Sequence, residues 1–97
     1  MTLNTPAVTG IEHDAAANRF QTVVDGQRAV LDYQLDAGVM VITHTGVPQA
    51  IGGRGIAAQL TRYALDHARA AGWKVVPACT YAATFMQRHG EYADLLG

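Results

Sequence analysis

Several residue types are scarce in this chain, which has one cysteine, three prolines and 15% charged residues among 97 positions. A lone cysteine, Cys79, excludes an internal disulfide and is typical of a reducing compartment. Lysine and arginine form no cluster and the net charge is −1, so a surface for nucleic acid or for an anionic membrane is not expected.

Long hydrophobic runs are also lacking. No stretch approaches the roughly 18 apolar residues that a membrane span requires, and the first residues carry neither the basic nor the apolar region of a signal peptide. We therefore expect a cytoplasmic protein with no membrane partner. No repeat or linker interrupts the chain, and 49% hydrophobic residues are typical of a compact fold. Residues 1–97 are expected to form one domain.

The first half of the chain has the pattern of β-strands. Apolar and β-branched residues predict strands over 8–13, 19–24, 28–35 and 39–45, after a lead-in over 1–7. Asp25-Gly26 is a two-residue hairpin signal, and Asp36-Ala37-Gly38 provides a second turn. Strands joined by such short turns pair antiparallel, so this half is predicted to be an antiparallel meander.

The hydrophobic period changes after Gly55. Apolar residues then recur at intervals of three and four, which predicts a helix that Gly72 ends. A short strand over 74–77 follows, and a second helix is predicted over 82–88. In the tail over 90–97, Tyr92, Leu95 and Leu96 are expected to cover the core. The face of the long helix expected to be buried comprises Ile56, Leu60, Tyr63, Ala64, His67, Ala68 and Ala71.

The order of these elements gives the fold class. A strand, a helix and a strand in succession predict a right-handed crossover, in which the strand over 74–77 lies parallel to the strand over 39–45. Together with the meander, this predicts an α+β fold: a mixed, mostly antiparallel sheet with one β-α-β crossover.

The most informative segment is Gly52-Gly53-Arg54-Gly55-Ile56-Ala57, between the strand over 39–45 and the long helix. Glycines let the backbone turn tightly and approach a ligand, and the first turn of a helix offers free N–H donors and a positive dipole end. A phosphate or pyrophosphate is the ligand that such a turn suits.

Two familiar phosphate motifs do not fit this turn. The segment formally matches the dinucleotide fingerprint G-x-G-x-x-A, but no carboxylate follows on the order of 20 residues later to hold a ribose hydroxyl. The preceding meander also replaces the expected first βαβ unit. A P-loop is rejected because no Gly-Lys-Ser/Thr follows the glycines.

Taken as a whole, the chain resembles the GNAT superfamily of acyl-CoA-dependent N-acetyltransferases, and within it a subgroup of small predicted acetyltransferases. The pyrophosphate loop of that family reads Arg/Gln-x-x-Gly-x-Gly/Ala. Gly52 stands where the family usually has Arg or Gln, and Arg54 brings a charge two positions later. The resemblance covers roughly residues 12–95, and its supporting segments are Val24-Asp25-Gly26, Leu31-Asp32-Tyr33, His44-Thr45-x-Val47-Pro48, Val75-Val76-Pro77-x-Cys79 and the run from Arg88 to Leu95.

The resemblance implies acetyl-CoA as the co-substrate and an amine as the acceptor, either a small molecule or a lysine or N-terminus of a protein. It implies that the main chain around Thr45 and Val47 pairs with the pantetheine arm, where the strand before the loop diverges from the strand after the helix. The implied pyrophosphate loop consists of Gly52, Gly53, Arg54, Gly55, Ile56 and Ala57.

The same resemblance places Cys79 near the thioester, where its thiolate either accepts the acetyl group or plays no chemical part; a small buried thiol is the plain alternative. His44 suits the removal of a proton from the amine, although a strand histidine is more often structural. Whether His44 faces the cleft or the helices is left open by the sequence. Tyr81 is a candidate donor to the leaving thiolate or a coenzyme contact, and His89 a substrate contact or a helix cap.

No metal site is expected, because the four histidines are scattered and none has metal-ligand spacing with Cys79. Two other functions stay open beside acetyl transfer. One is a non-catalytic acyl-CoA-binding module, and the other is an interaction domain that kept the fold and lost the ligand. A monomer or a weak homodimer is expected.

Overall fold

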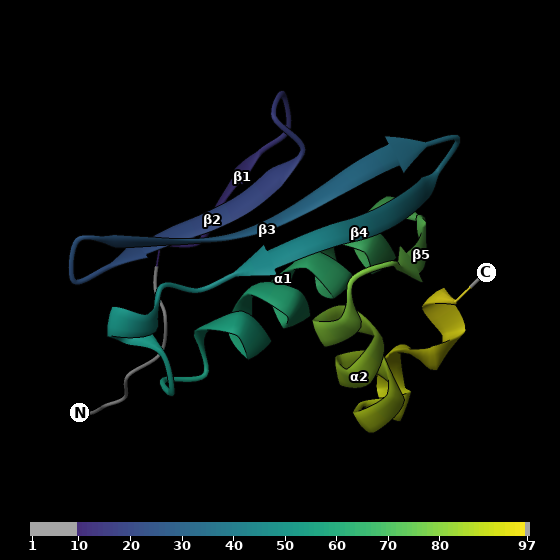
Figure 1. Ribbon diagram of the computed structural model, residues 1–97. Helices are drawn as coiled ribbons and strands as arrows, with labels where there is room; N and C mark the ends of the chain where they lie inside the picture. The colour runs from purple at the N-terminus through teal and green to yellow at the C-terminus, as the bar shows by residue number, and fades with distance from the viewer. Residues whose placement is uncertain (1–9, 97) are drawn as a thin grey trace, which may run out of the picture.

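The computed structural model describes residues 10–96, which form one five-stranded sheet with its helices packed against a single face (Figure 1). Along the sheet the strands follow chain order, from β1 to β5. The elements are β1 (Glu12–Asp14), β2 (Arg19–Val24), β3 (Gln27–Asp36), β4 (Val39–Gly46), the 3-10 helix η1 (Gln49–Ile51), α1 (Ile56–Ala71), β5 (Lys74–Pro77), α2 (Thr80–Arg88) and the 3-10 helix η2 (Gly90–Leu95).

The pairing of the strands confirms the predicted α+β class. Strands β1 to β4 pair antiparallel as a meander, and β5 lies parallel to β4 after the crossover through α1. The predicted first strand over 8–13 is observed only from Glu12 to Asp14. Gly10 and Ile11 precede it outside the ladder, and the rest of that prediction lies outside the described residues.

The β2–β3 and β3–β4 hairpins turn through left-handed residues. Asp25 and Gly26 have φ of 50° and 75°, and Ala37 and Gly38 have φ of 50° and 80°. Two consecutive residues with positive φ form the turn whose twist matches that of paired strands. The Asp25-Gly26 prediction is therefore confirmed, and the hairpin tip presents the Asp25 side chain to solvent.

Helix α1 ends as its sequence predicts. Gly72 adopts φ 77° and its N–H donates to the Arg69 carbonyl, while the Trp73 N–H donates to the Ala68 carbonyl at 2.8 Å. These two bonds define a Schellman motif, which satisfies carbonyls that the helix itself leaves unpaired. The motif reverses the chain and starts β5 directly beside β4.

The buried face of α1 differs from the predicted one. Leu65 and Thr61 are fully buried, whereas Tyr63 is 43% exposed and Ala71 is exposed. Helix α1 contacts α2 and η2 as well as the sheet, so its buried face extends to Thr61 and Leu65. The observed buried set is Ile56, Leu60, Thr61, Ala64, Leu65 and Ala68.

Helix α2 begins at Thr80, two residues before the predicted start, because Cys79 acts as its N-cap. The tail then forms η2, and Tyr92 and Leu95 are buried as the sequence predicts. Leu96 is 45% exposed, so its expected role in the core is wrong. Its backbone instead bridges to Val75 at the edge of the sheet.

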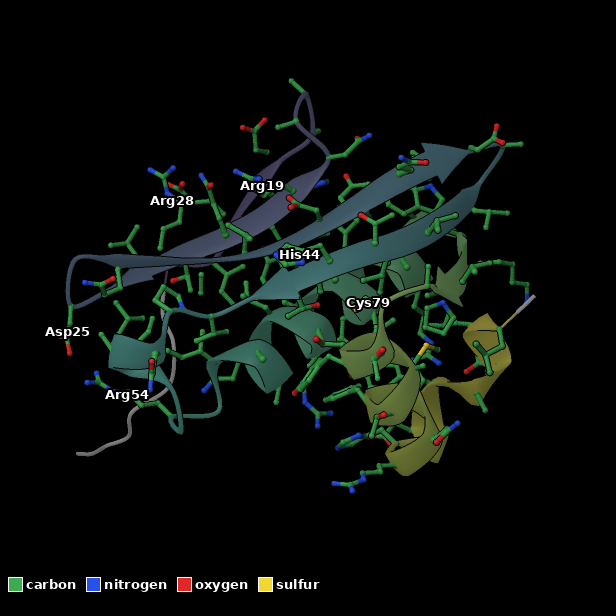
Figure 2. The ribbon with its side chains drawn as sticks, in the orientation of Figure 1. Arg19, Asp25, Arg28, His44, Arg54 and Cys79 are labelled. Carbon is green, nitrogen blue, oxygen red and sulfur yellow. The ribbon has the colours of Figure 1, made fainter. Side chains whose placement is uncertain are left out.

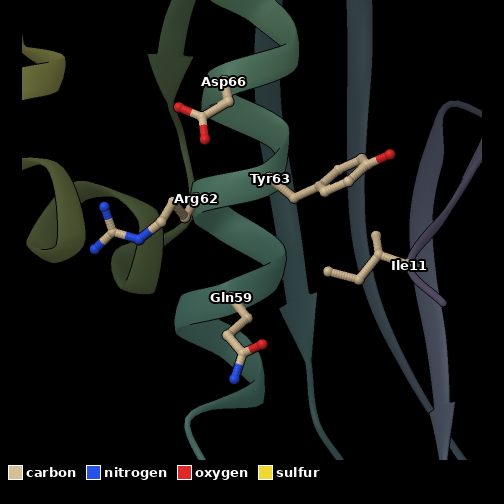
Figure 3. A pocket seen from close by; sticks show the side chains of 5 residues that line it. All are labelled: Ile11, Gln59, Arg62, Tyr63 and Asp66. Atoms are coloured by element: carbon tan, nitrogen blue, oxygen red, sulfur yellow. The ribbon is translucent and has the colours of Figure 1, made fainter. Parts of the chain in front are cut away.

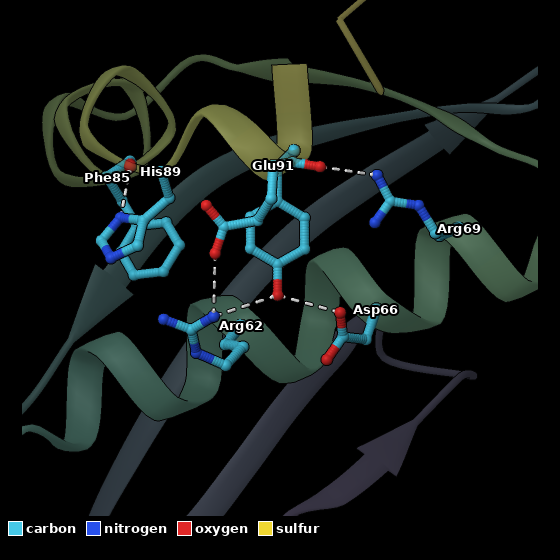
Figure 4. A network of polar contacts seen from close by, with 7 residues as sticks. Arg62, Asp66, Arg69, Phe85, His89 and Glu91 are labelled. Atoms are coloured by element: carbon cyan, nitrogen blue, oxygen red, sulfur yellow. Dashed lines mark hydrogen bonds and ion pairs between the residues drawn. The ribbon is translucent and has the colours of Figure 1, made fainter. Parts of the chain in front are cut away.

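A polar network joins α1 to η2 (Figure 4). The hydroxyl of buried Tyr92 donates to Asp66 at 2.9 Å and accepts from Arg62 at 3.4 Å. Arg62 also pairs with Glu91, and Arg69 donates to the Glu91 carbonyl at 2.9 Å. The network holds the last described element against the outer side of α1.

Replacing Tyr92 by phenylalanine removes both hydrogen bonds of its hydroxyl and leaves the buried ring in place. We expect Tyr92→Phe to lower the free energy of unfolding by about 1 kcal/mol, measured by urea denaturation. Tyr81→Phe is the matched control, because the Tyr81 ring is 40% exposed and its hydroxyl has no hydrogen bond within residues 10–96. Equal losses in the two variants would contradict the role given to the Tyr92 hydroxyl.

An aromatic cluster fixes β1 to the sheet and to α1. The His13 ring stacks on Phe20 with centroids 4.2 Å apart, and its Nε2 lies 2.6 Å from the Tyr33 hydroxyl. His67 of α1 meets the His13 ring edge-on at 4.5 Å. Burial and the charge of His67 lower the pKa of His13, and Asp14 opposes this shift.

A lowered histidine pKa means that the folded state binds its proton less readily than the unfolded state. The stability due to neutral His13 is therefore present above the ordinary pKa of about 6.5 and is lost as the pH falls through that value toward the lower folded pKa. We expect the wild type to lose more stability between pH 7.5 and pH 5.5 than His13→Gln, as measured by urea denaturation at both values. Parallel losses in the two proteins would refute this assignment.

Candidate functional site

Strands β4 and β5 diverge halfway along β4. Their parallel pairing ends at Ile42 opposite Pro77, and β4 then continues to Gly46. The chain after β5 turns away, because the N–H groups of Ala78 and Cys79 both donate to the Ile42 carbonyl, at 2.9 and 3.0 Å. The rest of β4 has no ladder to β5, which is the strand divergence that the sequence resemblance implies (Figure 1).

A β-bulge in β4 lies at the point of divergence. Ile42 pairs with Tyr33 on β3, but the next pair is His44 with Asp32, so Thr43 is one extra residue in β4. A bulge changes the face to which the following side chains point. The strand alternation read from the sequence is therefore not sufficient to place His44.

The register after the bulge settles the orientation of the candidate residues. Thr45 pairs with Leu31, which is fully buried against the helices, so Thr45 lies on the helix-covered face. His44 pairs with Asp32 on the opposite face, where Asp32 forms an ion pair with Arg19 at 2.6 Å. The exposed imidazole of His44 thus lies on the face of the sheet that carries no described helix (Figure 2).

Cys79 lies on the helix side of the divergence. Its half-buried Sγ is 3.6 Å from the Thr45 hydroxyl and accepts the Ala82 N–H at 3.4 Å. As N-cap of α2 it stands closer to a helix start than the sequence predicts. The positive end of the α2 dipole therefore lies at the sulfur, and either atom of the contact between Thr45 and Cys79 can be the donor.

The glycine turn follows β4 directly. After η1, the Gly52 N–H donates to the Gln49 carbonyl at 3.0 Å. Gly53 and Gly55 then adopt φ of 77° and 76°, and Gly55 is the N-cap of α1 without a side-chain cap. Residues other than glycine rarely take this conformation, so the turn depends on both glycines.

Backbone donors accumulate at this turn. Within residues 10–96, no protein acceptor is found for the N–H groups of residues 53–57. Gly52 differs, because its N–H is already used by Gln49. Ile56 is 2% exposed as a whole residue, so its side chain belongs to the core. The turn can accept an anion through the backbone.

The side chain of Arg54 adds a positive charge to the turn. Its Nη1 forms an ion pair at 2.6 Å with the Asp25 carboxylate, which lies at the tip of the β2–β3 hairpin (Figure 2). Both side chains are exposed, by 48% for Arg54 and 66% for Asp25. Sequence reasoning did not identify Asp25 as a site residue, since nothing in the local pattern relates two residues 29 positions apart.

The remaining candidates are distributed around this centre. Val47 is half-buried against the core, just after β4. Tyr81 lies in the first turn of α2, where burial raises the pKa of its hydroxyl. The His89 side chain contacts the end of α2: its Nδ1 lies 2.8 Å from the Phe85 carbonyl oxygen and its ring stacks on the Phe85 ring (Figure 4). This contact agrees with the helix-cap reading of His89.

A separate open hollow of about 230 Å³ lies on the outer side of α1 (Figure 3). It takes none of its lining from the glycine turn, β4 or β5, and so is distinct from the strand divergence. Its lining residues are Ile11, Gln59, Arg62, Tyr63 and Asp66.

The structure brings some of the candidate residues together and separates others. Cys79 and Thr45 are in contact, and the glycine turn stands at the end of the same strand. His44 and Cys79, the two catalytic candidates, lie on opposite faces of the sheet and are not in contact. No group of three or more metal-ligating side chains is found in the described part of the chain, and none of its helices has the length and hydropathy to cross a bilayer.

Comparison with known proteins identifies the class to which this fold and site belong. Residues 19–95 match the family model of the GCN5-related N-acetyltransferases, so the chain belongs to that family.

Individual relatives agree with this assignment. The chain is 33% identical over 82 residues to protein NATD1 from Mus musculus and from Homo sapiens, which covers 81% of this chain and 74% and 73% of those proteins. The solution structure of a GCN5-like putative N-acetyltransferase from Staphylococcus aureus superposes with a TM-score of 0.73 at 25% identity, over 94% of this chain and 90% of that one.

Proposed function

We propose that this protein is an acetyl-CoA-dependent N-acetyltransferase that acts on an amine. One juxtaposition carries the proposal: a glycine turn with free backbone donors stands at the end of β4, the strand that diverges from β5. An elongated ligand fits this arrangement if its diphosphate lies at the glycine turn and its thiol-bearing arm lies along β4 beyond Ile42. Membership of the GCN5-related family supports the same reading.

In this proposal the backbone N–H groups from Gly53 to Ala57 hold the pyrophosphate, and the main chain of Thr45 and Val47 pairs with the pantetheine arm. The exposed edge of β4 beyond Ile42 supports the second contact, because an unpaired strand edge can bond an extended ligand as it would another strand. Acetyl-CoA supplies the reactive group, an acetyl thioester.

Two routes of transfer are compatible with the positions of the side chains. In the direct route, the amine nitrogen attacks the thioester carbon, the carbon–sulfur bond breaks, and the CoA thiolate that leaves takes a proton from the Tyr81 hydroxyl or from water. His44, on the open face, takes the proton that the amine loses. In the covalent route, Cys79 Sγ first displaces CoA, and the amine then displaces Sγ and restores the thiol.

The first experiment is a calorimetric titration with CoA, with acetyl-CoA as a second ligand. Binding is expected with both, and the absence of heat and of any thermal shift at millimolar CoA would refute the proposal. The second is incubation with radiolabelled acetyl-CoA and a panel of amines. Binding without transfer to any amine would favour the non-catalytic acyl-CoA module.

The route is decided by Cys79→Ala. In the covalent route this variant loses both the label on the protein and the transfer to amine, although it still binds CoA. Label on the amine that persists unchanged in Cys79→Ala would leave only direct transfer. His44→Gln then tests the proton acceptor, because loss of transfer that is relieved at high pH is the signature of a missing base.

A further inference from the structure

We propose that Asp25 is an internal competitor for the phosphates of the coenzyme, so that the β2–β3 hairpin sets coenzyme affinity through Arg54. The inference rests on the proposed function and adds to it a residue that lies outside the glycine turn. Its observation is the 2.6 Å ion pair between Asp25 and Arg54 (Figure 2).

Arg54 is the cation best placed to meet a phosphate at this site. It is part of the glycine turn itself, and the sequence has no other lysine or arginine between Arg28 and Arg62. The position where the family usually carries Arg or Gln is Gly52 in this chain, so the turn depends on Arg54 for side-chain charge. A guanidinium binds phosphate through several N–H groups in a planar fork.

In the structure that charge is already partnered. Only Nη1 of Arg54 contacts Asp25, and both groups are well exposed to solvent. Exposed ion pairs of this kind are weak, so a polyanionic ligand can exchange with the carboxylate. When the Arg54 guanidinium binds a phosphate instead, the Asp25 carboxylate loses its partner. It remains nearby as a negative charge and repels the phosphate.

The hairpin holds Asp25 in this place. Asp25 is the first residue of a two-residue turn and has φ 50°, a conformation that aspartate and asparagine tolerate better than most residues. The carboxylate is therefore presented at the tip of β2 and β3, toward the turn that precedes α1. Asparagine keeps the turn and removes only the charge, which makes Asp25→Asn a clean variant.

The test is a calorimetric titration of CoA into the wild type, Asp25→Asn and Asp36→Asn. Asp36 is the matched control, because it lies at the other end of β3, at the second hairpin, and gives the same change in net charge. We expect Asp25→Asn to bind CoA about two- to fivefold more tightly at low salt, with the gain shrinking as salt is added. Asp36→Asn should bind as the wild type does.

Arg54→Gln completes the experiment. It should weaken CoA binding, and it should affect CoA more than a pantetheine fragment that carries no phosphate. CoA binding that is equal or weaker in Asp25→Asn overturns the inference and leaves the proposed function standing. Failure of every variant to bind CoA overturns both. A gain shared equally by Asp36→Asn also overturns it, since the effect would then be one of net charge alone.

Discussion

Replacing Gly55 by aspartate is expected to weaken CoA binding about 100-fold and to leave the fold intact. Gly55 is the N-cap of α1 and stands among the free backbone donors of the glycine turn. A carboxylate there lies within a few ångströms of the proposed pyrophosphate. At such distances two charges repel by about 1–4 kcal/mol in a wet environment, and a factor of 100 lies within that range.

The fold should survive this substitution for two reasons. A Cβ at Gly55 meets no atom within 4 Å, and aspartate tolerates the left-handed backbone better than most residues. A negative charge at the start of α1 also interacts favourably with the helix dipole. The φ of 76° strains any side chain at this position, so the melting temperature of the free protein should fall by a similar, modest amount in Gly55→Asp and Gly55→Asn, and comparison of the two variants separates loss of the ligand from backbone strain.

Gly55→Asn is the matched control, because asparagine has the same shape and backbone tolerance without the charge. It should weaken CoA binding only modestly, through side-chain bulk near the turn. Calorimetric titration of the three proteins decides the matter. If asparagine and aspartate weaken binding equally, bulk and not charge is responsible, and an anion at this turn is no longer supported.

The second large effect concerns stability. Leu65→Ala is expected to lower the free energy of unfolding by about 3 kcal/mol, because Leu65 is fully buried on α1 and its truncation leaves a cavity. For a domain of this size, the melting temperature should fall by roughly 15 °C. Urea denaturation and calorimetry both measure the change.

Tyr63→Ala is the informative comparison on the same helix. Tyr63 is 43% exposed, and its ring meets the edge of Phe20 with centroids 5.7 Å apart. We expect a loss of about 1 kcal/mol or less, typical of positions away from the core. If Tyr63→Ala lowered the free energy of unfolding as much as Leu65→Ala, the result would favour the buried face of α1 that the sequence predicted.

This contrast shows why the sequence predicted some features and not others. The β2–β3 and β3–β4 hairpins, the crossover and the end of α1 are local features. Residues such as Asp25-Gly26 and Gly72 determine them within a few positions. The buried face of α1 depends on how α2 and η2 lie against it. The helical periodicity is compatible with burial of either Tyr63 or Leu65, so tertiary contacts determine which side chain is buried.

The same distinction applies to the candidate site. The glycine turn and the proximity of Cys79 to the end of β4 follow from the order of the elements and from the family resemblance. The face to which His44 points depends on the extra residue Thr43 in β4 relative to β3. No local sequence pattern around Thr43 predicts this bulge. The Asp25–Arg54 ion pair joins two turns that only the folded sheet brings together.

The extra residue Thr43 also resets the phase of β4. In a regular strand, residues an odd number of positions apart point to opposite sides, so Ile42 in the core and Thr45 beside Cys79 would be incompatible. The bulge allows both Ile42 and Thr45 to lie on the helix-covered face. It also places the imidazole of His44 on the face opposite to the Cys79 sulfur. Deletion of Thr43 alone would keep Thr45 on the helix-covered face and His44 on the open face. Insertion of one further residue after Thr43 would exchange the faces of these two side chains.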